Sequence, residues 1–156
     1  MLHLISKNLS KEKTKKIFLD GKFKVKCKLS NEKSVEGEFI CETVAYGFSD
    51  PVSRLTLLLC ERRYQKIAED YFEALCNIRE LLEKENIFPF CYGACEDVYP
   101  IGMRRGVDSG LNAYQLEFGE QAKKLVHIFD SEDNLIPVPV AVQRKYFKDY
   151  CNSFRW

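Results

Sequence analysis

Apolar and polar residues alternate strictly along residues 22–29 of the chain. Lysine occupies each even position, and Phe, Val, Cys and Leu occupy the odd ones. This period of two predicts a half-buried strand with one apolar and one solvated face. Ser30–Ser34 predicts a turn, and Val35–Cys41 predicts the second strand of a hairpin. Arg54–Glu61 predicts a strand buried on both faces, because Leu57–Cys60 is apolar without interruption.

Apolar residues recur at helical spacing in two later segments. In Asp70–Glu85 the apolar face consists of Tyr71, Ala74, Leu75, Ile78, Leu81 and Leu82. Asp70 followed by Glu73 is a capping box of the Asp kind, which marks the start of a helix. Pro139 suits the first turn of a second helix, which we expect to run to about Phe154.

The order of these elements predicts the fold class. A polar connector, Arg62–Lys66, separates the first strands from the first helix. Ile87–Cys95 and Leu111–Phe118 predict further strands, and Leu125–Phe129 predicts a short strand or the end of a helix. This order predicts an α+β fold, with two principal helices packed on a mainly antiparallel sheet. With 156 residues, 46% of them hydrophobic, and no evident linker, we expect one domain over residues 1–156.

The all-lysine face of the first strand has two explanations. Charged side chains commonly protect an exposed strand from pairing edge to edge, and this is the more frequent reason for such a face. The same lysines could instead dock on phosphates or on an acidic protein partner. Nucleic-acid binding through Lys22, Lys24, Lys26 and Lys28 is the least favoured use, because 24 basic residues are balanced by 23 acidic ones.

Composition also bears on location and on bound groups. The longest apolar run, Leu57–Cys60, is far shorter than the roughly 18 residues that a membrane span needs. The first residues reach Lys7 too early for a signal peptide, so we expect a cytoplasmic protein. The seven cysteines lie mostly in apolar segments, which favours buried free thiols. Cys91 and Cys95 are spaced too widely for a Cys-x-x-Cys redox motif, so a redox pair is the weaker reading, and no spacing fits zinc. We therefore expect no metal and no cofactor.

The sequence lacks the common catalytic signatures. It contains no Gly-x-Ser-x-Gly elbow, no Walker lysine loop and no His-Glu-x-x-His. His127 lies within an apolar run, which favours a satisfied, half-buried side chain over a general base. A nucleophilic pair would need Cys91 or Cys95 beside His127, with the pKa of the thiol lowered. Enzymatic activity is therefore the less favoured expectation.

The segment Pro100–Tyr114 contains three of the eight glycines. Glycine at 102, 106 and 110 would permit positive φ angles and close backbone approach, as anion-binding nests require. The spacing is not Gly-x-Gly-x-x-Gly, and no clear helix follows to supply a dipole. An ordered loop between two core strands, pinned by pairs of arginine and aspartate, is the favoured reading.

Three segments together resemble a known group of proteins. They are Asp70–Leu82, Cys91–Met103 and Gly110–Ala122, with the distinctive block Tyr-Pro-x-Gly-Met followed by Gly-Leu-x-Ala-Tyr. The chain is similar here to small bacterial proteins encoded beside polymorphic or contact-dependent toxins, which resemble immunity proteins. It departs from their usual pattern at 107–109 and Asn112, where a methionine–glycine pair and a lysine are usual. No role for this loop is therefore carried over from the resemblance.

The resemblance implies a non-enzymatic binding protein, an immunity protein that neutralises a bacterial toxin domain encoded nearby by direct binding. Such inhibitors act through complementary shape and charge, and aromatic and arginine side chains are the usual anchors of interfaces. The expected partner contacts are Glu96, Asp97, Tyr99, Met103, Arg104, Arg105 and Asp108. The alternative is an enzyme or a small-ligand-binding domain with a pocket under the Glu96–Asp108 loop. Cys91, Cys95, Asp97, Arg104, Arg105 and His127 would then converge on a small anion.

Overall fold

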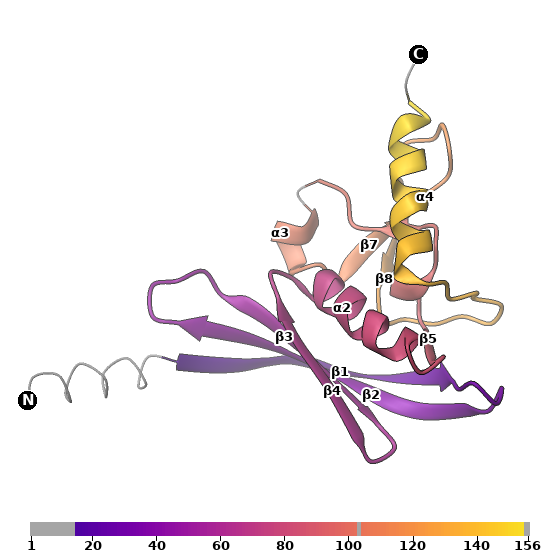
Figure 1. The fold of residues 1–156 in the computed structure, drawn as a ribbon. Coiled ribbons are helices and arrows are strands. Elements are labelled where there is room, and N and C mark those ends of the chain that lie inside the picture. The colour runs from indigo at the N-terminus through magenta and orange to yellow at the C-terminus, as the bar shows by residue number, and fades with distance from the viewer. Residues whose placement is uncertain (1–14, 103, 155–156) are drawn as a thin grey trace, which may run out of the picture.

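The computed structural model describes residues 15–102 and 104–154. Figure 1 shows a long, twisted sheet with the helices on one side of it. The strands are β1 (Lys15–Lys28), β2 (Ser34–Tyr46), β3 (Val52–Leu59), β4 (Arg62–Ala68), β5 (Phe88–Phe90), β6 (Val98–Tyr99), β7 (Asn112–Gln115) and β8 (Lys124–His127). The helices are α2 (Tyr71–Glu83), the 3₁₀ turn η1 (Tyr92–Ala94), α3 (Arg104–Asp108) and α4 (Val140–Asn152). The mixed fold with antiparallel pairing agrees with the predicted α+β class.

The larger sheet has the strand order β4-β3-β2-β1-β5, and every neighbouring pair is antiparallel. The predicted hairpin is present but longer than expected, because β1 and β2 pair from Lys15 with Tyr46 to Lys28 with Ser34. The register shifts between Leu19 and Gly21, so β1 bulges at that point.

The core lies between this sheet and α2. The alternating residues Val25 and Cys27 of β1 are buried as the period of two predicted, and their lysine neighbours are exposed. The sheet side of the core consists of Val25, Cys27, Phe39, Cys41, Leu55, Leu57 and Leu59, and the helix side of Tyr71, Phe72, Leu75, Ile78 and Leu82. Each fully buried large apolar side chain contributes roughly 1.5–3 kcal/mol. This packing explains the apolar face of α2 without any bound group.

Helix α2 begins where the sequence indicated. Asp70 precedes it in an extended conformation and accepts a hydrogen bond of 2.8 Å from the backbone N–H of Glu73. This bond satisfies one of the amide groups that a helix leaves unpaired at its start. The carboxylate of Glu73 also forms an ion pair with Arg144 of α4. The predicted N-terminal cap is therefore confirmed.

The prediction of a polar connector at Arg62–Lys66 was wrong, because these residues form most of β4. The two-residue turn Cys60–Glu61 joins Leu59 to its cross-strand partner Arg62. Cys60 adopts a φ of 56°, a conformation that favours glycine or asparagine, so the usual turn signal is missing from the sequence. The many charged residues of β4 belong to an edge strand, where charge is expected.

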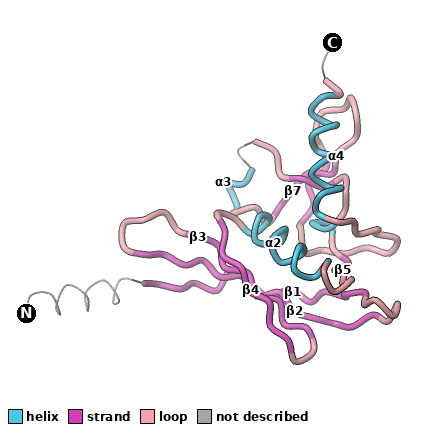
Figure 2. Tube along the Cα trace, in the orientation of Figure 1, coloured by secondary structure: helices cyan, strands magenta, loops and turns pink. Residues whose placement is uncertain are grey.

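The placement of the second principal helix also differs from the prediction. Among the described helices, α2 makes the main contacts with the five-stranded sheet, through β3, β4 and β5, whereas α4 contacts α2 and β6. Strands β6, β7 and β8 form a separate antiparallel sheet beside α4 (Figures 1 and 2). The segment predicted as a short strand or helix end, Leu125–Phe129, forms most of strand β8 and the residues after it. The strand predicted at Ile87–Cys95 is shorter, because only Phe88–Phe90 forms β5 and Tyr92–Ala94 forms η1. These strands are too short to give a clear period of two.

A cluster of buried polar side chains joins helix α2 to helix α4. Arg79 of α2 is 2% exposed, and its guanidinium donates hydrogen bonds to the carbonyl oxygens of Gly93, Ala94 and Val138 and to Gln143 Oε1. Gln143 of α4 is fully buried and donates through Nε2 to the carbonyl oxygens of Gly93, Cys95 and Val98 at 2.8–2.9 Å. We call Arg79 and Gln143 the buried hub, because together they fasten α2 and α4 to η1.

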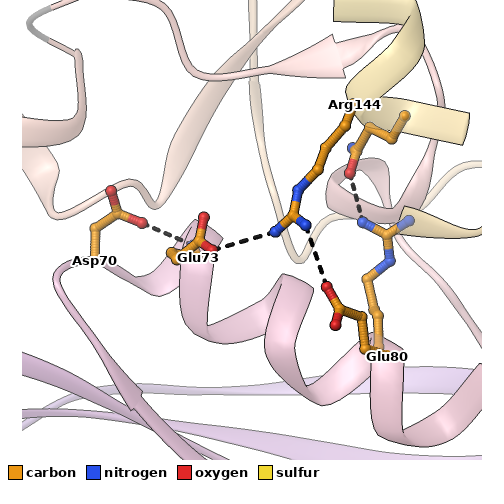
Figure 3. Close-up of polar contacts among 6 residues, drawn as sticks. Asp70, Glu73, Glu80 and Arg144 are labelled. Carbon is orange, nitrogen blue, oxygen red and sulfur yellow. Dashed lines mark hydrogen bonds and ion pairs between the residues drawn. The ribbon is translucent and has the colours of Figure 1, made fainter. Parts of the chain in front are cut away.

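An exposed contact reinforces the same helix pair. Arg144 of α4 bridges two carboxylates of α2, at 3.2 Å from Glu73 and 3.3 Å from Glu80 (Figure 3). All three side chains are at least one-third exposed, so this bridge contributes little to stability compared with the buried hub.

Candidate protein-binding surface

The residues predicted as partner contacts lie around β6 and α3. Glu96 and Asp97 stand between η1 and β6, Tyr99 lies in β6, and Asp108 ends α3. The backbone of Arg104 and Arg105 opens α3, but their side chains and the whole of Met103 lie outside the described part of the structure.

Two of these residues have clear packing roles. The ring of Tyr99 stacks on Phe147 with centroids 4.0 Å apart, and it meets the ring of Phe72 edge to face at 5.0 Å. Asp97 accepts a hydrogen bond from Gln115 Nε2, and its carbonyl oxygen accepts one from the backbone N–H of Leu116. Tyr99 thus ties the small sheet to both principal helices, and Asp97 ties β6 to β7. Glu96 is exposed and remains a predicted contact.

The segment Pro100–Tyr114 connects strands β6 and β7, as predicted, and its described residues include the short helix α3 and the start of β7. Gly102 and Gly110 have positive φ angles of 59° and 76°, whereas Gly106 lies within α3. The segment docks on the start of α2, because the backbone N–H of Tyr71 donates to the carbonyl oxygen of Ser109 at 2.7 Å. A Cβ at Gly110 would lie 3.1 Å from Asp70, so glycine permits this close approach.

The thiols near this segment are poor nucleophiles. Burial raises the pKa of Cys91 to about 12 and that of Cys95 to about 11. The Cys95 thiol donates to the carbonyl oxygen of Cys91 at 3.5 Å. Because only the thiolate attacks, both groups stay protonated and unreactive near neutral pH. The arrangement does not supply the activated thiol that the alternative reading required.

His127 has the satisfied, half-buried environment that the sequence indicated. Its Nδ1 accepts a hydrogen bond from the backbone N–H of Phe129, and its ring lies 4.8 Å from the ring of Phe23. Burial lowers the pKa of His127, so the neutral imidazole is favoured. A packing role accounts for each of these contacts.

A groove lies beside Glu96 and Asp97, and its lining includes Gln115, Leu135 and Tyr146. Over the described residues, no three His, Cys, Asp or Glu side chains come together in a group that could hold a metal ion. In the same part of the chain, no helix is both long enough and apolar enough to cross a membrane.

Cysteine accessibility gives a direct check of the described structure. Cys60 and Cys151 are exposed, and the other five cysteines, 27, 41, 76, 91 and 95, are buried. We expect Ellman's reagent at pH 8 to titrate two thiols rapidly in the native protein and all seven after denaturation in guanidinium chloride. Substituting serine at Cys60 and Cys151 together should abolish the rapid phase. A rapid phase of four or more thiols in the native protein would contradict the described core.

Among the described residues, five exposed large apolar side chains lie elsewhere, at the far end of the β1–β2–β3 strands. We call this region the distal arm and define it as residues 15–20 with residues 43–52. Figure 1 shows it extending away from the helices at the left of the view. Its exposed apolar residues are Ile17 (45%), Phe18 (53%), Leu19 (60%), Tyr46 (43%) and Phe48 (111%).

The base of the distal arm is fixed by hydrogen bonds. The bulged residue Asp20 accepts hydrogen bonds through Oδ2 from the hydroxyl groups of Thr43 and Tyr71. Burial and the Asp20 carboxylate both raise the pKa of Tyr71, so its hydroxyl remains a donor. Tyr71 also bonds to Ser109 through its backbone, as described above, so one residue supports both the distal arm and the segment that contains α3.

The distal arm was not predicted from the sequence, because the first strand was expected to begin at Lys22. The missed signal is the run Ile17-Phe18-Leu19, which lies between two lysines and an Asp-Gly pair. Three consecutive apolar residues have no period of two, so the run does not indicate a half-buried strand.

Comparison with protein-family models and with curated protein sequences finds no match to this chain.

Proposed function

We propose that this chain is a non-enzymatic binding protein that acts in the cytoplasm and neutralises a bacterial toxin domain by direct binding, in the manner of the immunity proteins that its sequence resembles. The observation that carries the proposal is the distal arm, which presents two phenylalanines, a tyrosine, a leucine and an isoleucine to solvent. Aromatic side chains of this kind contribute much of the binding energy at protein interfaces.

The form of the distal arm favours a protein partner over a small ligand. Small ligands bind in concave sites that enclose most of their surface. The distal arm is instead a projection (Figure 1), with Phe48 in the turn between β2 and β3 and Phe18 in β1. An apolar projection suits insertion into a hollow of another protein, such as the active-site cleft of a toxin domain. Exposed apolar residues that form a group, rather than standing singly, mark interaction sites.

The predicted contact region complements the distal arm. Helix α3 contains the backbone of two predicted contacts, Arg104 and Arg105, and also Val107, which is 68% exposed. The residue after α3, Ser109, is bonded to Tyr71 at the base of the distal arm. We therefore propose one interface made of the distal arm and the surface of α3. Tyr99 and Asp97 support this interface through their packing contacts.

Growth rescue tests the proposed function. The product of the adjacent gene would be expressed from an inducible promoter in a bacterial host, with and without this chain. We expect the adjacent gene alone to arrest growth and co-expression to restore it, with the two purified proteins forming a one-to-one complex. A harmless neighbour, or rescue without a complex, would contradict inhibition by direct binding.

A further inference from the structure

We propose that the edge of β1 over Lys15–Val25 accepts an extended, acidic segment of the partner protein as an added strand. This inference deepens the proposed function and rests on it, because it names the chemistry of the segment that the binding protein recognises. The added strand would lie antiparallel or parallel to β1, on the side opposite β2. Main-chain hydrogen bonds would supply affinity, and side chains at alternate positions would supply specificity.

The sheet provides the position for such a strand. β5 pairs with β1 only at Lys26–Lys28, and the chain then leaves the sheet at Cys91 to form η1. Along Lys15–Val25, β1 has one paired strand among the described residues, which is β2. We call Lys15–Val25 the open edge. A groove lined by Val25, Phe90 and Leu135 continues from its inner end.

Side chains on the open edge combine charge with exposed apolar surface. Lys15, Lys16, Lys22 and Lys24 lie along it, and charge of this kind commonly protects an exposed strand. The open edge differs from a fully charged one in its apolar residues. The open edge carries Ile17, Phe18 and Leu19, each at least 45% exposed. A long edge with exposed apolar side chains favours pairing with another chain.

The opposite edge of the same sheet shows what a protected edge looks like. β4 carries Arg62, Arg63 and Lys66, and its one large exposed apolar residue is Ile67. Arg62 and Tyr64 also bond to Glu85 beyond the end of α2, which ties β4 to the body of the protein. The contrast with β4 singles out β1 as the edge suited to an added strand.

Charge selects an acidic segment. Lys24 pairs in register with Glu38 of β2 and forms an ion pair of 3.7 Å with Glu36, so β2 already supplies acidic neighbours on one side of the lysines. Lys22 stands opposite Ile40, and its diagonal neighbours on β2 include Glu38. A strand with glutamate or aspartate at alternate positions would place carboxylates on the other side of Lys22 and Lys24. Opposite charges on adjacent strands favour pairing.

The same charges limit the register and the identity of the partner. Glu132 and Asp133 line the groove beside Lys24 and Lys26, so acidic residues are favoured toward Lys22 and disfavoured beyond Lys26. A second copy of this chain is a poor occupant, because an antiparallel β1–β1 pair would bring lysines of one copy toward lysines of the other. A protein segment of opposite charge satisfies both conditions.

Titration of the full-length, ¹⁵N-labelled protein with synthetic peptides tests the inference by NMR. The probe is a peptide of about six residues, the usual strand length, in which glutamate and valine alternate. The first control replaces each glutamate with lysine. The second control is a pair of peptides with N-methyl groups on alternate amides, so that each peptide has lost the hydrogen-bond donors of one of its two edges. We expect the glutamate peptide to change the amide chemical shifts of the open edge and the lysine peptide to leave them unchanged. One of the two N-methylated peptides should fail to bind.

Two matched variants separate pairing at the open edge from general attraction to lysine. Lys22→Glu should weaken binding of the glutamate peptide by about tenfold, because Lys22 lies on the open edge. Lys28→Glu should change it less than about twofold, since Lys28 lies on the same strand where β5 covers it.

Four outcomes would overturn the inference. They are shifts centred on β4, equal binding of both N-methylated peptides, tighter binding of a thymidine oligonucleotide at the same residues, and self-association through β1 in the absence of peptide. Each would leave the proposed function standing if growth rescue and a one-to-one complex are observed. Failure of rescue together with peptide binding at the open edge would instead reject the toxin partner and keep the strand-accepting edge.

Discussion

Replacing Arg79 with methionine is expected to lower the free energy of unfolding by about 3–5 kcal/mol. The guanidinium is buried and donates to four acceptors. Two of them keep another donor in the variant, because Gly93 O also accepts from Gln143 Nε2 and Ala94 O also accepts from the backbone N–H of Val138. Val138 O and Gln143 Oε1 would each lose the hydrogen bond that they accept from Arg79. Buried acceptors left without a donor cost roughly 1–3 kcal/mol each. Urea denaturation followed by circular dichroism measures the change.

Arg144→Met is the matched control for this prediction. Arg144 also joins α4 to α2, but it lies at the surface, so its loss should cost less than about 1 kcal/mol (Figure 3). Gln143→Leu should be as costly as Arg79→Met, and the double variant should be less destabilised than the sum, because both side chains belong to one network. If Arg79→Met and Arg144→Met lowered the free energy of unfolding equally, the buried hub would not be what holds α2 and α4 together.

Replacing Phe18 and Phe48 together with serine is expected to weaken partner binding by at least about 100-fold while leaving the fold intact. Interface aromatic residues that act as hot spots contribute about 2 kcal/mol or more each. Both rings are more than half exposed, so the free protein loses little packing when they are removed. Calorimetric titration of the purified partner measures the affinity, and thermal unfolding measures the stability.

Ile136→Ser with Val142→Ser provides the control for the distal arm. These side chains are 76% and 41% exposed, and neither belongs to the distal arm or to α3. Their replacement removes a comparable exposed apolar surface and should leave affinity within about twofold of the original value. If the control pair weakened binding as much as Phe18 and Phe48, the interface would lie elsewhere on the molecule.

The sequence predicted those parts of the fold in which local pattern and tertiary structure agree. The alternation at 22–29, the capping residue Asp70 and the apolar face of α2 each reflect burial on one side of a regular element. β4 was missed because Cys60 occupies a turn position at which glycine or asparagine is the usual signal. The placement of α4 was wrong because its attachment depends on Arg79 and Gln143, two polar residues that ordinary patterns assign to the surface.

The candidate interface was only partly predictable for a related reason. Tyr99 has the side chain of a typical interface anchor, but its ring packs against Phe72 and Phe147, which are distant in sequence. Ile17, Phe18 and Leu19 read as a short apolar run, which a chain usually buries. Only the strand pairing shows that this run extends past the start of α2, where no described helix covers it. Exposure of this kind is a property of tertiary structure and leaves no periodic signal.

Hydrogen–deuterium exchange of the complex with the product of the adjacent gene tests the central claim most directly. The claim is that the partner binds to the distal arm and the open edge of β1. We predict slower exchange at the amides of residues 15–25 and 43–52 in the complex than in the free protein, with β4 unchanged as the internal reference. A stable complex in which both segments exchange at the rate of the free protein would contradict the claim.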